Sequence, residues 1–205
     1  MRALILVDLQ YDFCPGGALA VARGDETIAV ANRVMPLFDV VVCTQDWHPA
    51  DHHSFAVNNP GARPGDLGEL GGLPQVMWPA HCVQGTQGAE IHDGLTRTLV
   101  AEVVRKGTDP VIDSYSGFFD NGHQKATGLA DILAARGVTE VVVMGLATDY
   151  CVKHTALDAR GLGYPVTLIE DGCRAVDLTA GDGDRAIEAL RAAGCTITTS
   201  TALLG

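Results

Sequence analysis

Residues 139–159 read TEVVVMGLATDYCVKHTALDA, and no other stretch says as much about the architecture. The run TEVVVM is rich in β-branched apolar residues, which is typical of a strand covered on both faces of a parallel sheet. A helical pattern follows it, and Cys151 lies in what we predict to be the first helical turn, three residues after Thr148. The stretch therefore indicates one strand–helix unit of an α/β protein.

Similar apolar runs recur at residues 3–8, 39–44, 99–104, 164–170 and 195–200. Helical patterns lie between several of them, over residues 25–38, 126–137 and 183–194, and the last two end at glycine, as helices commonly do. Alternating strands and helices predict a three-layer α/β/α fold with a mainly parallel six-stranded sheet. A chain of 205 residues, 47% of them hydrophobic, fits one such domain over residues 1–205.

The interval from Thr44 to about Arg97 breaks this alternation. It is rich in glycine and proline and shows no second strand–helix pair, so we expect a long functional loop or a disordered one. Trp78, His81 and Cys82 indicate that at least its second half packs against the domain, because disordered segments are poor in such residues.

The charge balance excludes several classes of protein. The formal net charge is −11, whereas nucleic-acid binding usually needs clustered basic residues. No apolar run approaches the ~20 residues that span a bilayer, and the N-terminal MRALILVDLQYDF reaches an acid too early for a signal peptide. We expect a soluble, cytoplasmic protein without nucleic-acid or membrane partners. Homo-oligomerisation stays open.

The six cysteines are scattered along the chain, without a CxxC pair. A domain of this size buries its own core, so the cysteines do not predict a disulfide framework. The missing CxxC argues against a tetrahedral thiolate zinc site and a thioredoxin-like motif. Free thiols in a reducing compartment are the expectation.

Three reactive residues follow apolar runs, at the end of a parallel sheet where ligands bind. Asp8 ends the first run, Lys106 follows the third and Cys151 follows the fourth. A thiolate attacks carbonyl carbon, and a helix N-terminus with a nearby ammonium lowers the pKa of a thiol. Lys106 would be that ammonium, and Asp8 would take the thiol proton and deliver it to a departing amine. Backbone N–H groups of the LATDYC turn would hold the oxyanion.

Each of these residues also has a structural interpretation. Cys151 could fill the core, Asp8 could order a loop, and Lys106 could be a solvated charge. A thiol redox sensor would need a resolving cysteine nearby, and a metal-binding scaffold would have no use for the triad. A dinucleotide-binding domain would need GxGxxG after the first strand, which DLQYDFCPGGAL lacks. The joint placement of the three residues favours catalysis.

A second group of candidate residues suits a metal ion. Asp46 and His48 in TQDWHPADHHSF lie two residues apart, so on an extended segment they point the same way, and His81 lies in WPAHC. One carboxylate and two imidazoles can hold Zn²⁺, Fe²⁺ or Mn²⁺ and leave positions open for water or substrate. From the spacing alone these histidines could equally be surface or hydrogen-bonding residues.

Nearly the whole chain resembles the nicotinamidase/pyrazinamidase family of the isochorismatase-like cysteine hydrolases. The resemblance lies in six segments that occur in the family's order: VDLQYDFCPGGALAV, TQDWHPADHHSF, WPAHCVQGTQGAE, VRKGTDP, YSGF and GLATDYCVKHTALDA. It implies an isochorismatase-like fold with a six-stranded sheet, and hydrolysis of nicotinamide to nicotinate and ammonia in NAD salvage. Pyrazinamide would be a second substrate.

The resemblance also implies roles for individual residues. It gives a catalytic triad of Asp8, Lys106 and Cys151, one divalent metal ion, zinc before iron or manganese, on Asp46, His48 and His81, and His52 as a further ligand or a residue beside the metal. Phe13 and Trp78 would flank the pyridine ring, Tyr115 would close the pocket, and the peptide between Leu146 and Ala147 would be cis, beside the oxyanion hole. A related amidase acting on a carbamoyl or ureido substrate is the alternative, although such relatives generally lack the metal set.

Overall fold

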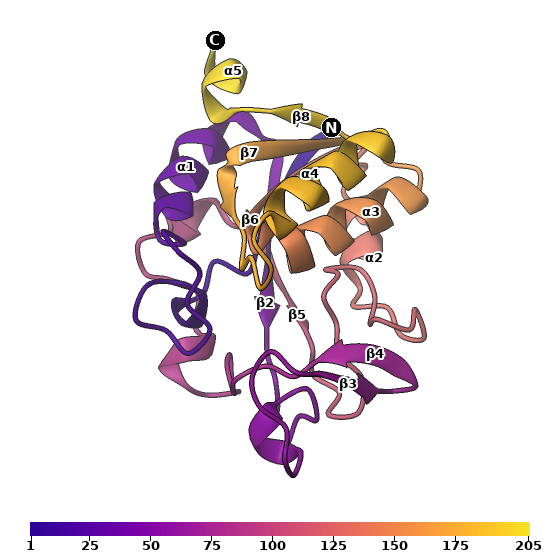
Figure 1. Cartoon of the computed structure of the whole chain (residues 1–205). Coiled ribbons are helices and arrows are strands. Elements are labelled where there is room, and N and C mark those ends of the chain that lie inside the picture. The colour runs from indigo at the N-terminus through magenta and orange to yellow at the C-terminus, as the bar shows by residue number, and fades with distance from the viewer.

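Six strands form one parallel sheet in the order β5-β2-β1-β6-β7-β8 (Figure 1). In the computed structural model, which describes residues 1–205, they are β1 (Arg2–Val7), β2 (Val40–Asp46), β5 (Glu102–Lys106), β6 (Glu140–Leu146), β7 (Val166–Arg174) and β8 (Thr196–Thr198). The chain order changes direction between β1 and β6, and the crevice at such a point is where open α/β sheets bind ligands. The predicted parallel sheet is confirmed.

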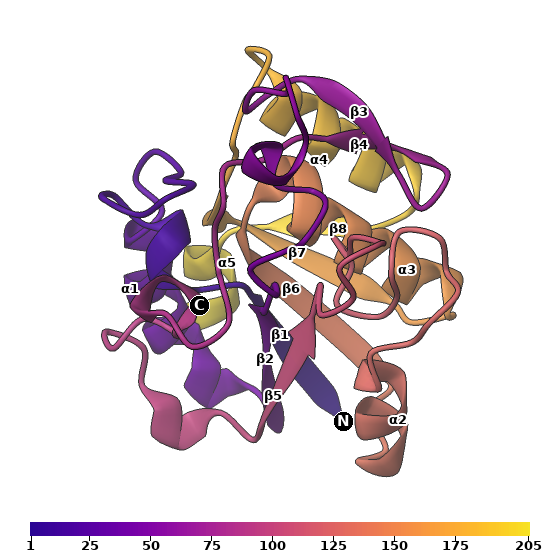
Figure 2. The same ribbon diagram turned by 90° about the horizontal axis from the view of Figure 1, so that it is seen from below.

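Helices cover both faces of this sheet (Figures 1 and 2). On one face lie α1 (Glu26–Val34) and the short α5 (Ser200–Leu204), and on the other lie α2 (Leu129–Ala135), α3 (Lys153–Gly161) and α4 (Asp182–Ala192). Because both faces are covered, the central strands need apolar residues throughout, and residues 3–7 of β1 and 141–144 of β6 have no exposed surface. We find no helix with the length and apolarity to cross a bilayer.

Several strand boundaries differ from the prediction, and two of the differences have a clear physical cause. The run at 99–104 becomes β5 only from Glu102, because pairing with β2 begins opposite Val42 and residues 97–99 form a 3₁₀ turn. The run at 195–200 is β8 for only three residues, because Asp171 accepts hydrogen bonds from the backbone N (2.7 Å) and Oγ (2.5 Å) of Ser200, where α5 begins.

The interval between β2 and β5 contains an antiparallel hairpin of β3 (Leu67–Leu70) and β4 (Leu73–Val76) that the sequence analysis missed. Gly71 and Gly72 connect the strands with φ of 60° and 77°, a conformation that favours glycine in a two-residue turn. In the sequence, the glycine pair between LGEL and LPQV is the feature that could have predicted this hairpin. The hairpin lies beyond the carboxyl ends of the sheet strands, so it can form one wall of a site there (Figure 1).

Candidate active site

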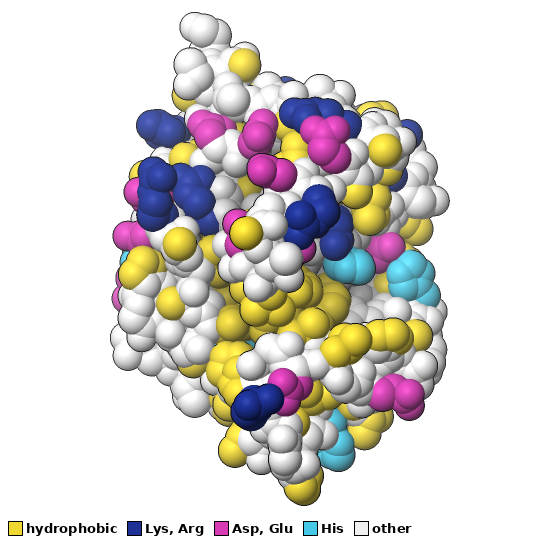
Figure 3. Space-filling view, in the orientation of Figure 1, with side chains coloured by type: hydrophobic (Ala, Val, Ile, Leu, Met, Phe, Trp, Pro, Cys, Tyr) yellow, Lys and Arg dark blue, Asp and Glu magenta, His cyan; other side chains and the backbone are white.

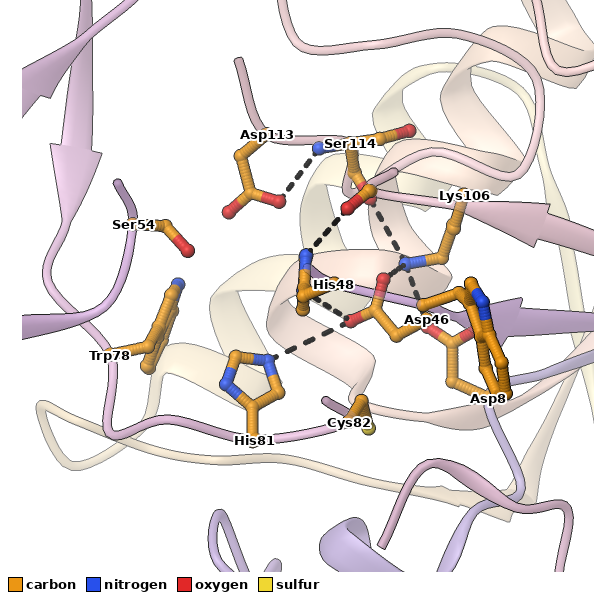
Figure 4. A network of polar contacts seen from close by, with 12 residues as sticks. Asp8, Asp46, His48, Ser54, Trp78, His81, Cys82, Lys106, Asp113 and Ser114 are labelled. Atoms are coloured by element: carbon orange, nitrogen blue, oxygen red, sulfur yellow. Dashed lines mark hydrogen bonds and ion pairs between the residues drawn. The ribbon is translucent and has the colours of Figure 1, made fainter. Parts of the chain in front are cut away.

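The strands bring the predicted residues to one edge of the sheet. Asp8 directly follows β1, and Asp46 and Lys106 are the last residues of β2 and β5. Cys151 lies in a π-helical turn, residues 148–152, that connects β6 to α3. Asp8 and Cys151 therefore lie close together across the β1–β6 crevice. Lys106 reaches both of them, and Figure 4 shows it between Asp46 and Asp8.

Lys106 is the centre of the cluster, and its side chain has no exposed surface. Its Nζ donates to Asp46 Oδ1 at 2.7 Å, to the carbonyl oxygen of Ser114 at 3.0 Å and to Cys151 Sγ at 3.3 Å. An ammonium has three hydrogens, so these bonds use all of them. Asp8 Oδ2, 2.9 Å from the same nitrogen, forms an ion pair with it and competes with the other three acceptors for these hydrogens.

Asp8 consequently has one carboxylate oxygen to spare. Its Oδ1 accepts from Thr44 Oγ1 at 2.6 Å, whereas Oδ2 is buried and has only the shared Lys106 ammonium beside it. The carboxylate oxygens of Asp8 and Asp46 and the sulfur of Cys151 offer ligand atoms that lie within 4.8 Å of one another. The geometry thus gives the proton of the Cys151 thiol an acceptor in Asp8.

The predicted cis peptide bond between Leu146 and Ala147 is present. The backbone N–H of Ala147 donates no hydrogen bond within the protein, and Ala147 borders the same pocket as Cys151. A free backbone donor beside the sulfur is the arrangement that an oxyanion requires.

Asp46, His48 and His81 form a second cluster, whose ligand atoms lie within 4.8 Å of one another. Asp46 Oδ2 is 3.4 Å from His48 Nε2 and 3.7 Å from His81 Nε2 (Figure 4). The Nδ1 atom of each ring is 2.8 Å from a backbone carbonyl oxygen, that of Gly107 or Pro79, and so must donate to it. Both Nε2 atoms then point toward Asp46 Oδ2, and a ring held through Nδ1 in this way is how metal-binding imidazoles are commonly oriented. The residues fit a divalent cation.

Both clusters border one small cavity, which Cys151 and Asp46 reach from the first and His48 and His81 from the second. Its wall comprises Phe13, Leu19, Asp46, His48, Trp78, His81, Asp113, Tyr115, Ala147, Tyr150, Cys151 and Val176. All four residues that we predicted to contact the substrate, Phe13, Trp78, Tyr115 and Ala147, are among them. In the space-filling view, hydrophobic side chains gather on this side of the molecule, between the hairpin and the helices (Figure 3). The cavity suits a small, flat, partly polar molecule.

Comparison with known families agrees with this architecture: the isochorismatase domain family matches residues 2–202. The chain belongs to this isochorismatase family. It is 52% identical to the nicotinamidase of Escherichia coli (strain K12) over 202 residues, which cover 97% of this chain and 94% of that protein.

Two solved structures of isochorismatase-family proteins extend the comparison. The Acinetobacter baumanii nicotinamidase/pyrazinamidase has 44% identity and a TM-score of 0.95, with 98% of this chain and 97% of that one covered. The Pyrococcus horikoshii pyrazinamidase, solved in complex with zinc, has 38% identity and a TM-score of 0.79, with 97% and 98% covered.

The charges around Cys151 change what we expected for the pKa of its thiol. Burial raises the pKa of the Cys151 thiol well above its ordinary value, and Lys106 only partly opposes this because Asp8 and Asp46 raise it further. Burial works against the charge of Lys106, but the same two carboxylates hold its pKa well above the usual range. Our expectation of a lowered thiol pKa is wrong for the resting site. The thiol keeps its proton, so an acceptor such as Asp8 becomes essential.

His52 belongs to a different group from the one formed by Asp46 and His81. Its ligand atom lies within 4.8 Å of those of His48 and Asp113. Its Nδ1 is 2.8 Å from Ser54 Oγ, and its Nε2 is buried without a partner. Whether His52 ligates a metal therefore stays a prediction, and its geometry favours a position beside the ligand set.

The sequence analysis missed four residues of the cavity wall, namely Leu19, Asp113, Tyr150 and Val176. Asp113 lies two residues before the recognised segment YSGF, and Tyr150 lies within GLATDYCVKHTALDA, so proximity to these segments was the available signal. Leu19 and Val176 are ordinary apolar residues, so only the structure shows that they line the cavity.

Proposed function

We propose that this chain is a nicotinamidase, a metal-dependent cysteine amidohydrolase that converts nicotinamide to nicotinate and ammonia, and pyrazinamide to pyrazinoate, in NAD salvage. One observation carries the proposal: a buried thiol with an ammonium and an unsatisfied carboxylate oxygen borders the same small cavity as a cation-binding set. The 52% identity to a nicotinamidase over almost the full chain supports it.

In the first half of the reaction, Asp8 Oδ2 accepts the thiol proton while Cys151 Sγ attacks the carboxamide carbon. Lys106 donates a hydrogen bond to the sulfur and stabilises the thiolate as it forms. The N–H of Ala147 stabilises the oxyanion. Asp8 then delivers its proton to the amide nitrogen, the C–N bond breaks, ammonia leaves, and a thioester remains on Cys151.

In the second half, Asp8 acts again as the base. It takes a proton from a water molecule that attacks the thioester carbon, and the oxyanion forms in the same place. Collapse of this intermediate breaks the C–S bond, releases the carboxylic acid as nicotinate, and returns the proton to Cys151 through Asp8. One carboxylate can serve both halves because its Oδ2 lies beside the reacting sulfur and has no hydrogen-bonding neighbour other than the mobile protons of Lys106 and Cys151.

Asp46, His48 and His81 would hold one divalent cation, with His52 as a further ligand or beside it. A bound cation would supply positive charge at the ring end of the cavity. We propose zinc, as in the Pyrococcus horikoshii relative, although iron or manganese suits the same ligands. Phe13 and Trp78 would flank the ring, and Tyr115 would close the pocket. All six cysteines are unpaired, which fits a cytoplasmic enzyme.

The first test is ammonia release from nicotinamide by wild type and by Cys151→Ala. The variant should lose at least about 10³-fold in turnover because no other group can form the acyl intermediate. Cys195→Ala, a change of the same type at a cysteine outside the cavity, is the matched control and should keep wild-type turnover. A Cys151→Ala enzyme with even a tenth of the wild-type rate would contradict covalent catalysis.

The metal site has a separate test. Asp46→Ala should lose the bound metal, measured by elemental analysis, because Asp46 supplies the one carboxylate of the set. The exposed Asp51→Ala, five residues further on, should keep it. Full metal content in Asp46→Ala would remove Asp46 from the ligand set. Metal and a reactive Cys151 without turnover of nicotinamide would favour a carbamoyl or ureido substrate instead.

A further inference from the structure

The β3–β4 hairpin reaches the active-site cavity through one side chain, that of Gln75. Most of the hairpin is solvent-exposed or half-buried, but Gln75 is only 2% exposed. Gln75 does not itself border the cavity, whereas the residues it binds do. A buried polar side chain in this position calls for an account of its hydrogen bonds.

Gln75 Nε2 lies within donating distance of three acceptors. They are the carbonyl oxygen of Val76 at 2.9 Å, Asp113 Oδ2 at 3.0 Å and Tyr115 Oη at 3.0 Å. An amide nitrogen has two hydrogens, so the three acceptors share them. Two of the acceptors, Asp113 and Tyr115, are parts of the cavity wall that lie 38 and 40 residues away along the chain.

The hydroxyl of Tyr115 accepts a second hydrogen bond, from Trp78 Nε1 at 3.2 Å. Gln75 and Trp78 are therefore both placed to donate to this oxygen, and the hydroxyl makes no hydrogen bond as a donor to another protein group. The ring of Tyr150 packs edge-on against those of Trp78 and Tyr115, with centroids 4.8 and 5.4 Å apart. The three rings and the amide thus form one unit.

We propose that Gln75 is a positioning residue that determines substrate specificity, acting through Tyr115. This inference rests on the proposed amidase function. By donating to Tyr115 Oη, Gln75 holds the Tyr115 ring against Trp78 in the cavity wall and so sets how closely this part of the wall approaches a planar ring. It also leaves Tyr115 only a donor to offer the cavity, which favours rings with an acceptor atom there over rings with a C–H group.

The test combines Gln75→Leu, Tyr115→Phe and the double variant. Gln84→Leu is the control, because Gln84 is an exposed glutamine whose side chain binds only the carbonyl oxygen of Trp47. Gln75→Leu should raise KM for nicotinamide about fivefold, the equivalent of one net hydrogen bond, and change kcat by less than about twofold. The ratio of kcat/KM for pyrazinamide and nicotinamide should shift as well, since these rings differ by one nitrogen. Gln84→Leu should match wild type.

The double variant decides whether Gln75 acts through Tyr115. If it does, adding Gln75→Leu to Tyr115→Phe should raise KM by less than about twofold. A further fivefold rise, or a Gln75→Leu enzyme with wild-type KM and substrate ratio, would overturn the proposal. Should Gln75→Leu fail to fold, Gln75→Asn keeps the amide but shortens its reach and should reproduce the KM effect.

A fluorescence measurement separates this inference from the proposed function. The chain has two tryptophans, so Trp47→Phe leaves Trp78 as the only one. In that background, Gln75→Leu and Tyr115→Phe should each increase acrylamide quenching of Trp78, and their combination should add nothing further. Unchanged quenching would overturn the positioning role even in an active enzyme. An enzyme inactive on nicotinamide that still shows increased quenching would contradict only the proposed function.

Discussion

The two edges of the sheet carry the same kinds of charged residue in opposite surroundings. At the amino edge, Arg2, Glu102 and Glu140 are the first residues of β1, β5 and β6. Their ion pairs, such as Arg136 Nη2 to Glu102 Oε1 at 2.8 Å, involve side chains that are about a third or more exposed. At the carboxyl edge, the side chains of Lys106 and Asp8 have no exposed surface.

This difference in burial suggests different roles: the exposed pairs interact mainly with water, whereas the buried charges can act on a reacting group. Two unit charges 4 Å apart interact by about 1 kcal/mol in water and by about 4 kcal/mol at the effective dielectric of a protein. Burial of charges also costs free energy, so a buried ion cluster is weak evidence for stability. The carboxyl-edge cluster is better explained by the reaction, because desolvated charges act strongly on a reacting thiol. The amino-edge pairs keep strand ends in water and need no precise geometry.

Lys106→Met should show the largest effect. It leaves the Asp8 and Asp46 carboxylates buried without their cation, so we expect a loss of about 3–5 kcal/mol in the free energy of unfolding and at least about 10³-fold in turnover. Urea unfolding at neutral pH measures the first. Combining Lys106→Met with Asp8→Asn removes one uncompensated charge and should recover part of the stability without any activity. Wild-type stability in Lys106→Met would mean that the cluster is solvated.

The same comparison explains which parts of the site could be predicted from the sequence. Asp8, Lys106 and Cys151 were predictable because each follows an apolar run, and parallel strands bring such positions together. The roles of Gln75 and Asp113 depend on contacts made across 38 residues of a segment without periodicity, so no local pattern indicates them. The thiol pKa of Cys151 was mispredicted because it depends on total burial and on two carboxylates, which spacing does not reveal.

His154, in the first turn of α3, is half-buried, so its burial lies between that of the charged residues at the two edges. Burial, assisted by the charge of Lys153, lowers its pKa to about 4, whereas an unfolded histidine titrates near ~6.5. The unfolded state therefore binds the proton first, and the stability from this group is complete above pH ~6.5 and declines as the pH falls toward about 4. His154→Gln should reduce the loss of unfolding free energy between pH 7 and 4.5 by about 1–2 kcal/mol. Identical pH profiles of the two proteins in urea unfolding would contradict this.

The amino edge should give the smallest effect. Glu102 pairs with Arg136 at 2.8 Å, but 44% of the glutamate side chain and 32% of the arginine side chain are exposed, so water and salt replace most of what the pair contributes. Glu102→Gln should change the free energy of unfolding by less than about 0.5 kcal/mol and leave turnover unchanged. Urea unfolding at low and high salt measures this directly, with Lys106→Met, at the other end of the same strand, as the reference. A destabilisation similar to that of Lys106→Met would show that burial does not distinguish the two edges, because the two substitutions differ mainly in how far each charge is removed from water.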